Sequence, residues 1–263
     1  SEISTDRFDS SLKVGYVFPE IPYQSFGFQS AYSNHKQEAY YGFRSYEIDQ
    51  ESFYANLLFN SIIGNTKNKF KAGLNFSFDQ YLETVDTFFF DRTDRSVGSF
   101  FEYSYDNLEN FSFVGGARVD IHNRLGTFVT PRLHLRYLPQ EKTIVRASIG
   151  SGRKAANIFA ENQTLFGTNR LISIQQNGGS IYGLNPEIAW NYGVSVRQIF
   201  ALWGGDGDIT ADYYITNFTD QVVVDWEKQG EISFYNLEGK SRANSFQLAI
   251  DYNPIKAISF RFA

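Results

Sequence analysis

Few residues of this chain have the types and spacing that catalysis requires. Residues 150–152 read Gly-Ser-Gly and lack the Gly-x-Ser-x-Gly pattern that presents a serine nucleophile on a tight turn. The chain also contains no phosphate-binding glycine loop and no His-Glu-x-x-His motif. His35, His122 and His134 are far apart and have no metal-ligand spacing. We therefore expect no enzyme activity, no metal site and no cofactor.

Charged residues of another kind are more informative, because each lies opposite an apolar stripe in a segment of alternating residues. Successive side chains of a β-strand point to opposite faces, so these charges belong to one face of a sheet. The set comprises Lys71, Asp79, Glu102, Arg118, Asp120, Arg132, His134, Arg136, Arg146, Arg197, Asp212, Asp251 and Arg261. Such a face is either a solvated wall or a surface on which an inserted domain docks, and the residues alone favour neither.

The segment 131–154 shows how the chain positions these charges. It predicts two strands joined by a turn at Pro139–Lys142, and the apolar residues at 133, 135 and 137 alternate with Arg132, His134 and Arg136. A soluble protein would bury the apolar face, whereas a membrane barrel turns it toward lipid and encloses the polar face. A Lys or Arg facing lipid near the midplane costs about 2–4 kcal/mol, so the faces are not interchangeable.

Composition narrows the class of protein. Aromatic residues make up 17% of the 263 residues, which suits strands and membrane interfaces. The formal net charge is -5, so nucleic acid is not an expected partner. No run of eighteen apolar residues is present, which excludes membrane-spanning helices but not a β-barrel, whose strands only alternate.

The order of connections favours an antiparallel transmembrane β-barrel. Short turns near residues 19, 64, 106, 139, 204 and 253 alternate with longer segments after residues 32, 80, 121, 150 and 216. Irregular segments are predicted at 33–50, 80–96 and 151–185. A short helix is a candidate within 157–165, and a strand is expected to begin at Asn185–Glu187. An aromatic residue precedes most short turns: Phe18, Tyr105, Tyr137, Trp203 and Tyr252. Outer-membrane barrels combine short periplasmic turns, long extracellular loops and aromatic girdles.

Four short motifs carry a family resemblance. Thr-x-x-Arg-Ala-Ser and Gly-x-Gly-Arg lie at 143–153, Leu-x-Pro-Glu-x-x-x-Asn-Tyr at 184–192, and Asn-x-x-Gly-Lys-Ser at 236–241. Together with the segment 212–225, in this order, they resemble the later barrel strands of TonB-dependent outer-membrane receptors, particularly those of Bacteroidota. The resemblance implies a 22-stranded barrel around an N-terminal plug in the bacterial outer membrane. Residues 1–263 would supply about a dozen strands of this single barrel domain, without the plug or the final strands.

The resemblance also implies a function. The receptor would bind a scarce nutrient, such as a ferric siderophore or cobalamin, in its extracellular loops and import it when TonB pulls on the missing plug region; its other partner would be outer-membrane lipid. Ligand candidates in the loops are Arg44, Phe89, Phe90, Arg92, Arg95, Arg153, Lys154 and Arg170. Residues expected to face the lumen and plug are Arg118, Arg132, His134, Arg136, Arg146 and Arg197. A passive porin, an adhesin and a soluble β-rich carbohydrate-binding module remain alternatives.

Overall fold

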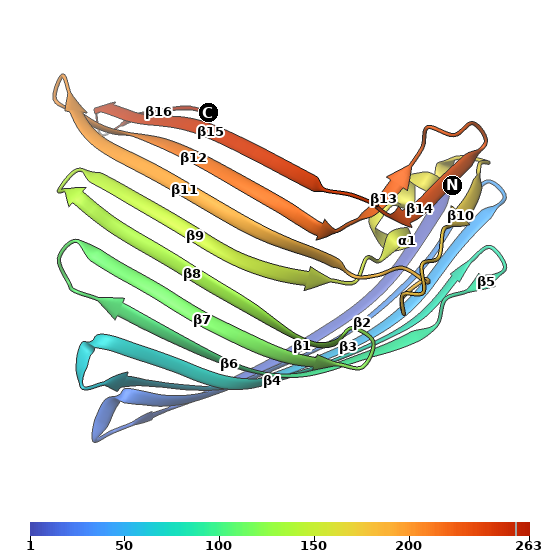
Figure 1. The fold of residues 1–263 in the computed structure, drawn as a ribbon, viewed down its shortest axis with the longest axis horizontal. Coiled ribbons are helices and arrows are strands. Elements are labelled where there is room, and N and C mark those ends of the chain that lie inside the picture. Colours follow the sequence, from blue (N-terminus) through green and yellow to red (C-terminus); the bar gives the residue numbers. More distant parts are fainter. Residues whose placement is uncertain (256) are drawn as a thin grey trace.

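The computed structural model describes residues 1–255 and 257–263, most of which form one open, strongly curved antiparallel sheet (Figure 1). Its long strands are β1 (Glu2–Phe18), β2 (Ile21–Tyr41), β3 (Arg44–Ile63), β4 (Asn65–Val85), β6 (Arg92–Asp106), β7 (Phe111–His122), β8 (Gly126–Gln140), β9 (Thr143–Lys154), β11 (Glu187–Leu202), β12 (Gly205–Asp220) and β15 (Ser241–Ile255). Two short strands, β5 (Phe88–Phe89) and β16 (Ile258–Phe262), bring the sheet to 13 strands. The predicted all-β, antiparallel barrel architecture is thereby confirmed.

The two ends of the sheet differ in their connections. At one end the strands are joined by tight turns, for example around Gly64, whose φ of 75° belongs to the left-handed region that glycine adopts without strain. At the other end the chain makes longer excursions, of which residues 155–186 and 221–240 are the largest. The predicted alternation of short turns and long loops is present only in part, because residues 42–43 and 123–125 at this second end are also short turns. We call the second end the long-loop end.

Two segments predicted to be irregular are strand instead. Residues 33–41 and 44–50 belong to β2 and β3, and residues 80–85 and 92–96 belong to β4 and β6. The hydrophobic period of two is lost there because the outer face becomes polar, as at the cross-strand pair Lys36 and Asp49. The inner face meanwhile carries buried apolar residues such as Tyr46 and Ile48. The prediction of loops at 33–50 and 80–96 was therefore wrong.

The outer face of the remaining sheet is a continuous apolar band. Its members are large and solvent-accessible in the isolated chain, among them Leu57, Leu74, Val119, Val194 and Phe246. Strand pairing places residues of neighbouring strands on the same face, because Leu57 is opposite Leu74 and the pattern continues around the sheet. In a membrane barrel this band contacts lipid and the opposite face lines the lumen.

The apolar band gives a direct test of the face assignment. Leu135→Arg places a cation among lipid chains, which costs about 2–4 kcal/mol near the midplane, so we expect loss of barrel assembly in the membrane. Arg136→Leu changes the neighbouring residue on the inner face and should leave assembly intact. The measurement is the heat-modifiable migration of the receptor in outer-membrane fractions. Equal assembly of both variants would contradict the assignment.

The most tightly packed part of the protein is at the long-loop end rather than inside the sheet. There residues 155–186 form α1 (Ile158–Glu161), η1 (Gln163–Gly167) and β10 (Leu171–Ile174), which confirms a short helix within 157–165. β10 pairs with β14 (Glu231–Asn236), which pairs with β13 (Val222–Asp225). Figure 1 shows these elements gathered at one end of the sheet. Among the described residues no helix has the length and apolar character needed to cross a membrane.

Candidate functional site

An aromatic core fixes the 155–186 loop to the inner face of the barrel wall. Phe159 is 1% exposed, and its ring centroid lies 5.0 Å from that of Phe90, 5.5 Å from Tyr182 and 6.1 Å from Phe234. We call the buried cluster around it the mouth core; it consists of Tyr46, Ile48, Val85, Ala156, Ile158, Phe159, Leu165, Phe166, Leu184, Ile232 and Phe234. Each buried Phe, Leu or Ile contributes about 1.5–3 kcal/mol relative to exposure, so the loop is held firmly.

A second aromatic contact anchors the same loop further along. Phe166 stacks on Tyr46 at 5.1 Å and on Tyr41 at 5.8 Å between ring centroids. Tyr46 lies on the inner face of β3, because its position and that of the lipid-facing Leu57 differ by an odd number and successive side chains of a strand point to opposite faces. The loop therefore folds into the barrel opening instead of extending away from it.

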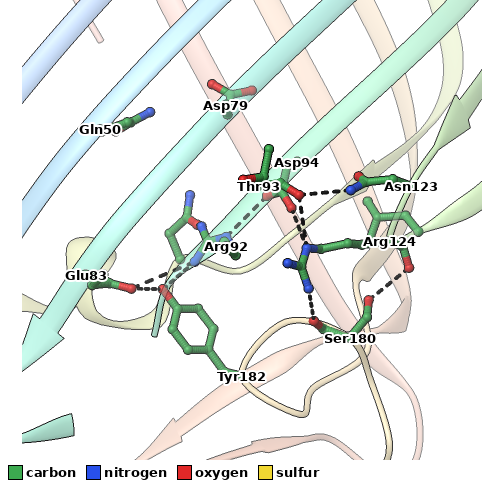
Figure 2. A network of polar contacts seen from close by, with 12 residues as sticks. Gln50, Asp79, Glu83, Arg92, Thr93, Asp94, Asn123, Arg124, Ser180 and Tyr182 are labelled. Carbon is green, nitrogen blue, oxygen red and sulfur yellow. Dashed lines mark hydrogen bonds and ion pairs between the residues drawn. The ribbon is translucent and has the colours of Figure 1, made fainter. Parts of the chain in front are cut away.

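Beside the mouth core lies a buried polar network, drawn in Figure 2, that joins the wall to the loop. Glu83 of β4 is 1% exposed and accepts hydrogen bonds from the hydroxyl of Tyr46, at 3.0 Å, and from that of Tyr182. The Nη1 of Arg92 lies 3.8 Å from Glu83 Oε2. Buried carboxylates are tolerated only with such partners, so Glu83 makes the position of Tyr182 specific.

Arg92 connects the two sides of this network. Its Nη1 donates to the Tyr182 hydroxyl at 2.8 Å, its Nε donates to Asp94 Oδ2 at 3.2 Å, and its Nη2 donates to the Asn157 side-chain oxygen. The guanidinium also lies 3.9 Å from the centroid of the Tyr81 ring, a cation–π geometry. Asn157 and Tyr182 belong to the loop, so one side chain from the wall holds both ends of it.

Arg124 continues the network to the neighbouring loop. Its Nε is 3.0 Å from Asp94 Oδ1, and its Nη1 donates to the Ser180 carbonyl at 3.2 Å. The Ser180 hydroxyl donates in return to the Arg124 carbonyl at 2.9 Å. We call Glu83, Arg92, Asp94, Arg124, Asn157, Ser180 and Tyr182 the mouth network.

Burial sets the protonation of two members of the network, both beyond the lipid-facing band. Burial raises the pKa of the Tyr182 hydroxyl, so it stays protonated and able to donate to Glu83. Burial likewise raises the pKa of Glu83, while the hydrogen bonds from Tyr182 and Tyr46 oppose the shift. The Glu83 carboxylate consequently depends on these donors.

The eight predicted ligand residues occupy separate places at the long-loop end. Arg92 and Phe90 belong to the network and core just described, and Arg92 is only 7% exposed. Arg44 donates to the Arg170 carbonyl, and the Arg170 guanidinium lies over the Trp226 ring at 6.0 Å. Phe89 is 75% exposed on β5, where it lies opposite Thr84 of β4. Arg44 also forms an ion pair with Asp86 at 3.7 Å.

The remaining three residues lie elsewhere. Arg153 stacks over Phe128 at 4.9 Å and donates to the Leu125 carbonyl at 3.0 Å. Lys154 forms an ion pair with Glu161 at 2.8 Å. Arg95 lies over Phe78 at 5.6 Å, on the outer face. Ligand binding by these residues stays a prediction.

Most members of the mouth network were not predicted from the sequence. The alternation of side chains along the strands could nevertheless have identified three of them. Asp79 and Glu102 were predicted to lie on the inner face. Glu83, on β4, is an even number of positions from Asp79, and Arg92 and Asp94, on β6, are an even number of positions from Glu102, so they lie on the same face. Extending the alternation into the polar segments would have found these three. Nothing comparable marks Asn157, Ser180 or Tyr182.

The six residues predicted to face the lumen form the second part of the site, and three of them, Arg118, Arg132 and Arg197, are paired. Lys71 and Arg132 share Glu102, while three further arginines each contact an inner-face carboxylate at 2.7 Å: Arg118 with Asp120, Arg197 with Asp208, and Arg261 with Asp251. Among the described residues, His134, Arg136 and Arg146 form no ion pair. Their strand register places them on the same face as the paired arginines.

The fold and this charged inner face define the class of outer-membrane β-barrel receptors. The family described as "TonB dependent receptor-like, beta-barrel" matches residues 3–263, and the chain belongs to it. The members of this family are transporters and receptors, not enzymes or soluble modules, and they reside in the bacterial outer membrane. No curated protein matches the chain by sequence.

Solved structures with the same fold are TonB-dependent receptors at low sequence identity. The siderophore receptor PirA of Acinetobacter baumannii has a TM-score of 0.71 at 10% identity over 95% of this chain and 42% of that one. The ferric enterobactin receptor PfeA of Pseudomonas aeruginosa gives 0.70 at 12% over 94% and 41%. The Serratia marcescens receptor HasR, in complex with its hemophore HasA and heme, gives 0.67 at 14% over 95% and 46%. The chain thus spans less than half the length of these three proteins.

Proposed function

We propose that this chain is the barrel portion of a receptor that captures a scarce nutrient outside the cell and imports it when TonB acts on a plug domain in the lumen. The observation that carries the proposal is the ordered long-loop end. Residues 155–186 are fixed on the inner face of β2, β3, β4 and β6 by the mouth core and the mouth network. A fixed surface of this kind can recognise a ligand.

The same observation supports a receptor over a passive porin. A porin needs an open aqueous path, whereas here apolar side chains such as Phe159 and Phe166 occupy the inner face at the opening. An adhesin would not need paired charges along the whole inner wall. The pairs at Glu102, Asp120, Asp208 and Asp251 suit a lumen that an inserted plug fills.

For the ligand we propose an iron chelate, with cobalamin as a second possibility. The named relatives include siderophore receptors and a receptor bound to a hemophore and heme. Ferric siderophores and heme carry negative charge or aromatic rings, which exposed arginines and aromatic side chains recognise. The proposed contacts are Arg44 at the start of β3, Phe89 on β5, Arg153 near the end of β9 and Arg170 in the 155–186 loop.

Two measurements on the full-length receptor test this function. Titration with ferric siderophores, heme and cobalamin should find submicromolar binding to one of them, and its uptake by cells should stop when TonB is deleted. Arg153→Ala should weaken that binding at least about tenfold, since hydrogen bonds to charged groups contribute about 1.5–3 kcal/mol. Lys67→Ala, at the short-turn end, is the control. Sugar diffusion through liposomes without any ligand binding would instead identify a porin.

A further inference from the structure

Two inner-face arginines break the rule of pairing that the other arginines of that face follow. Arg136 and Arg146 are directly opposite one another on β8 and β9. Like charges directly opposite on one face of a sheet are destabilising. No carboxylate among the described residues forms an ion pair with either, although Arg118, Arg132, Arg197 and Arg261 all have one. Among the described residues, this pair of like charges therefore has no carboxylate partner.

The neighbours of this pair form a polar belt across the sheet. The register aligns Ser112, Arg136, Arg146, Ser195 and Asp212 in one row over five adjacent strands. His134, Ser148 and Tyr214 lie in the next row on the same face. These residues line a concave pocket of about 660 Å³. Two guanidiniums, hydroxyl groups and an imidazole in one pocket are suited to binding oxygen anions.

The charge of the pocket favours a carboxylate over a phosphate. Asp212 lies two strands from Arg146, about 10 Å away across the sheet, and is too distant to neutralise it directly. It nevertheless reduces the positive charge of the pocket from two to one. A single carboxylate completes the neutralisation, whereas a phosphate dianion would leave excess negative charge. The planar forks of two arginines also match the two oxygens of a carboxylate.

We propose that Arg136 and Arg146 form a carboxylate-binding site in the lumen wall. The carboxylate comes either from an acidic side chain of the receptor's own lumen-filling domain or from a free anionic compound in the lumen. The first source rests on the proposed function, since it requires a plug; the second does not. In both cases the bound group removes the repulsion between the two arginines.

The test uses the thermal stability of the full-length receptor in detergent, with citrate as the free carboxylate probe. The variants are Arg136→Gln/Arg146→Gln and the single Arg146→Lys, which keeps the charge but loses the fork. Lys13→Gln is the matched control, because it removes an inner-face cation that lies opposite an uncharged residue, Gln29, and leaves no carboxylate without its partner. Sodium chloride at equal ionic strength controls for screening.

Three results are distinguishable. If the receptor supplies the carboxylate, the double variant melts several degrees lower than wild type without citrate, and Arg146→Lys falls between them. If a free anion binds, citrate but not chloride raises the melting temperature of wild type and leaves the double variant unchanged. A double variant that is equally or more stable, together with no citrate effect, overturns the proposal. The melting temperature can be measured without uptake and without a ligand at the long-loop end. Failure of the proposed function, which is tested by ligand titration and uptake, is therefore distinguishable from failure of this proposal.

Discussion

Replacing Phe159 with alanine should release the 155–186 loop from the barrel while the sheet itself stays assembled. Phe159 is the residue on which Phe90, Tyr182, Phe166 and Phe234 converge, so the substitution leaves a cavity in the centre of the mouth core. Phe→Ala changes in cores cost about 3–5 kcal/mol. The sheet is held by its own strand pairing and lipid-facing band, which do not include Phe159.

Trypsin measures the release, because Arg170 is the one lysine or arginine within residues 155–186. Proteolysis of a locally opened segment follows the population of its open form, so a loss of about 3 kcal/mol should accelerate cleavage at Arg170 at least about a hundredfold. Phe88→Ala, at an exposed tip of the same end, is the control and should change little. Unaltered cleavage in Phe159→Ala, or collapse of the whole barrel, would show that the loop is not a separate unit.

The fold was accessible from sequence wherever one face of a strand meets lipid. There the side-chain period of two is enforced, because a charge on the wrong face is costly, and segments such as 70–78 and 131–137 show it plainly. Where the strands extend past the lipid-facing band, the outer face no longer has to be apolar. Lys36 and Asp49 can occupy the outer face of β2 and β3 while Ile48 is buried inside, so the strands continue without their hydrophobic signature.

Only part of the site could be predicted from the sequence, because strand alternation determines the face of a residue but not its contacts. The parity of a strand determines which face a residue occupies, and the inward positions of Arg118, Arg132, Arg136 and Arg146 follow from it. Parity says nothing of contacts between segments far apart in the chain. The bond between Tyr182 and Glu83 joins residues 99 positions apart through a loop that has no periodic pattern, so only the three-dimensional structure shows it.

This division also explains why Arg92 was placed among the ligand candidates. A run with Asp91, Arg92, Asp94 and Arg95 in a segment without hydrophobic alternation has the composition of a solvated loop. In the structure, alternate members point to opposite sides, so Arg92 and Asp94 are buried while Arg95 remains accessible. Neighbouring arginines in the sequence thus have very different environments.

That contrast gives the second large expected effect, in the substitution Arg92→Ala. The change removes the donor to Tyr182, Asp94 and Asn157. It leaves the buried Glu83 carboxylate without its cation, whereas Asp94 keeps its contact with Arg124. Removing one partner of a buried pair costs about 3–5 kcal/mol, most of it from the charge left behind. We expect faster trypsin cleavage at Arg170, comparable to that of Phe159→Ala, and loss of ligand binding. Arg95→Ala deletes an accessible arginine three residues away and should leave the cleavage rate at Arg170 unchanged.

A double substitution distinguishes lost charge compensation from lost packing. If the uncompensated Glu83 carboxylate is the source of the instability, Glu83→Gln should be less harmful in the Arg92→Ala background than in wild type. Gln keeps an acceptor for Tyr46 and Tyr182 but carries no charge. The coupling energy between the two positions, obtained from the four cleavage rates, should then reach at least about 1 kcal/mol. Additive effects would mean that Arg92 acts through its contact with the Tyr81 ring instead, and that Glu83 is stabilised by its two tyrosine hydroxyls alone.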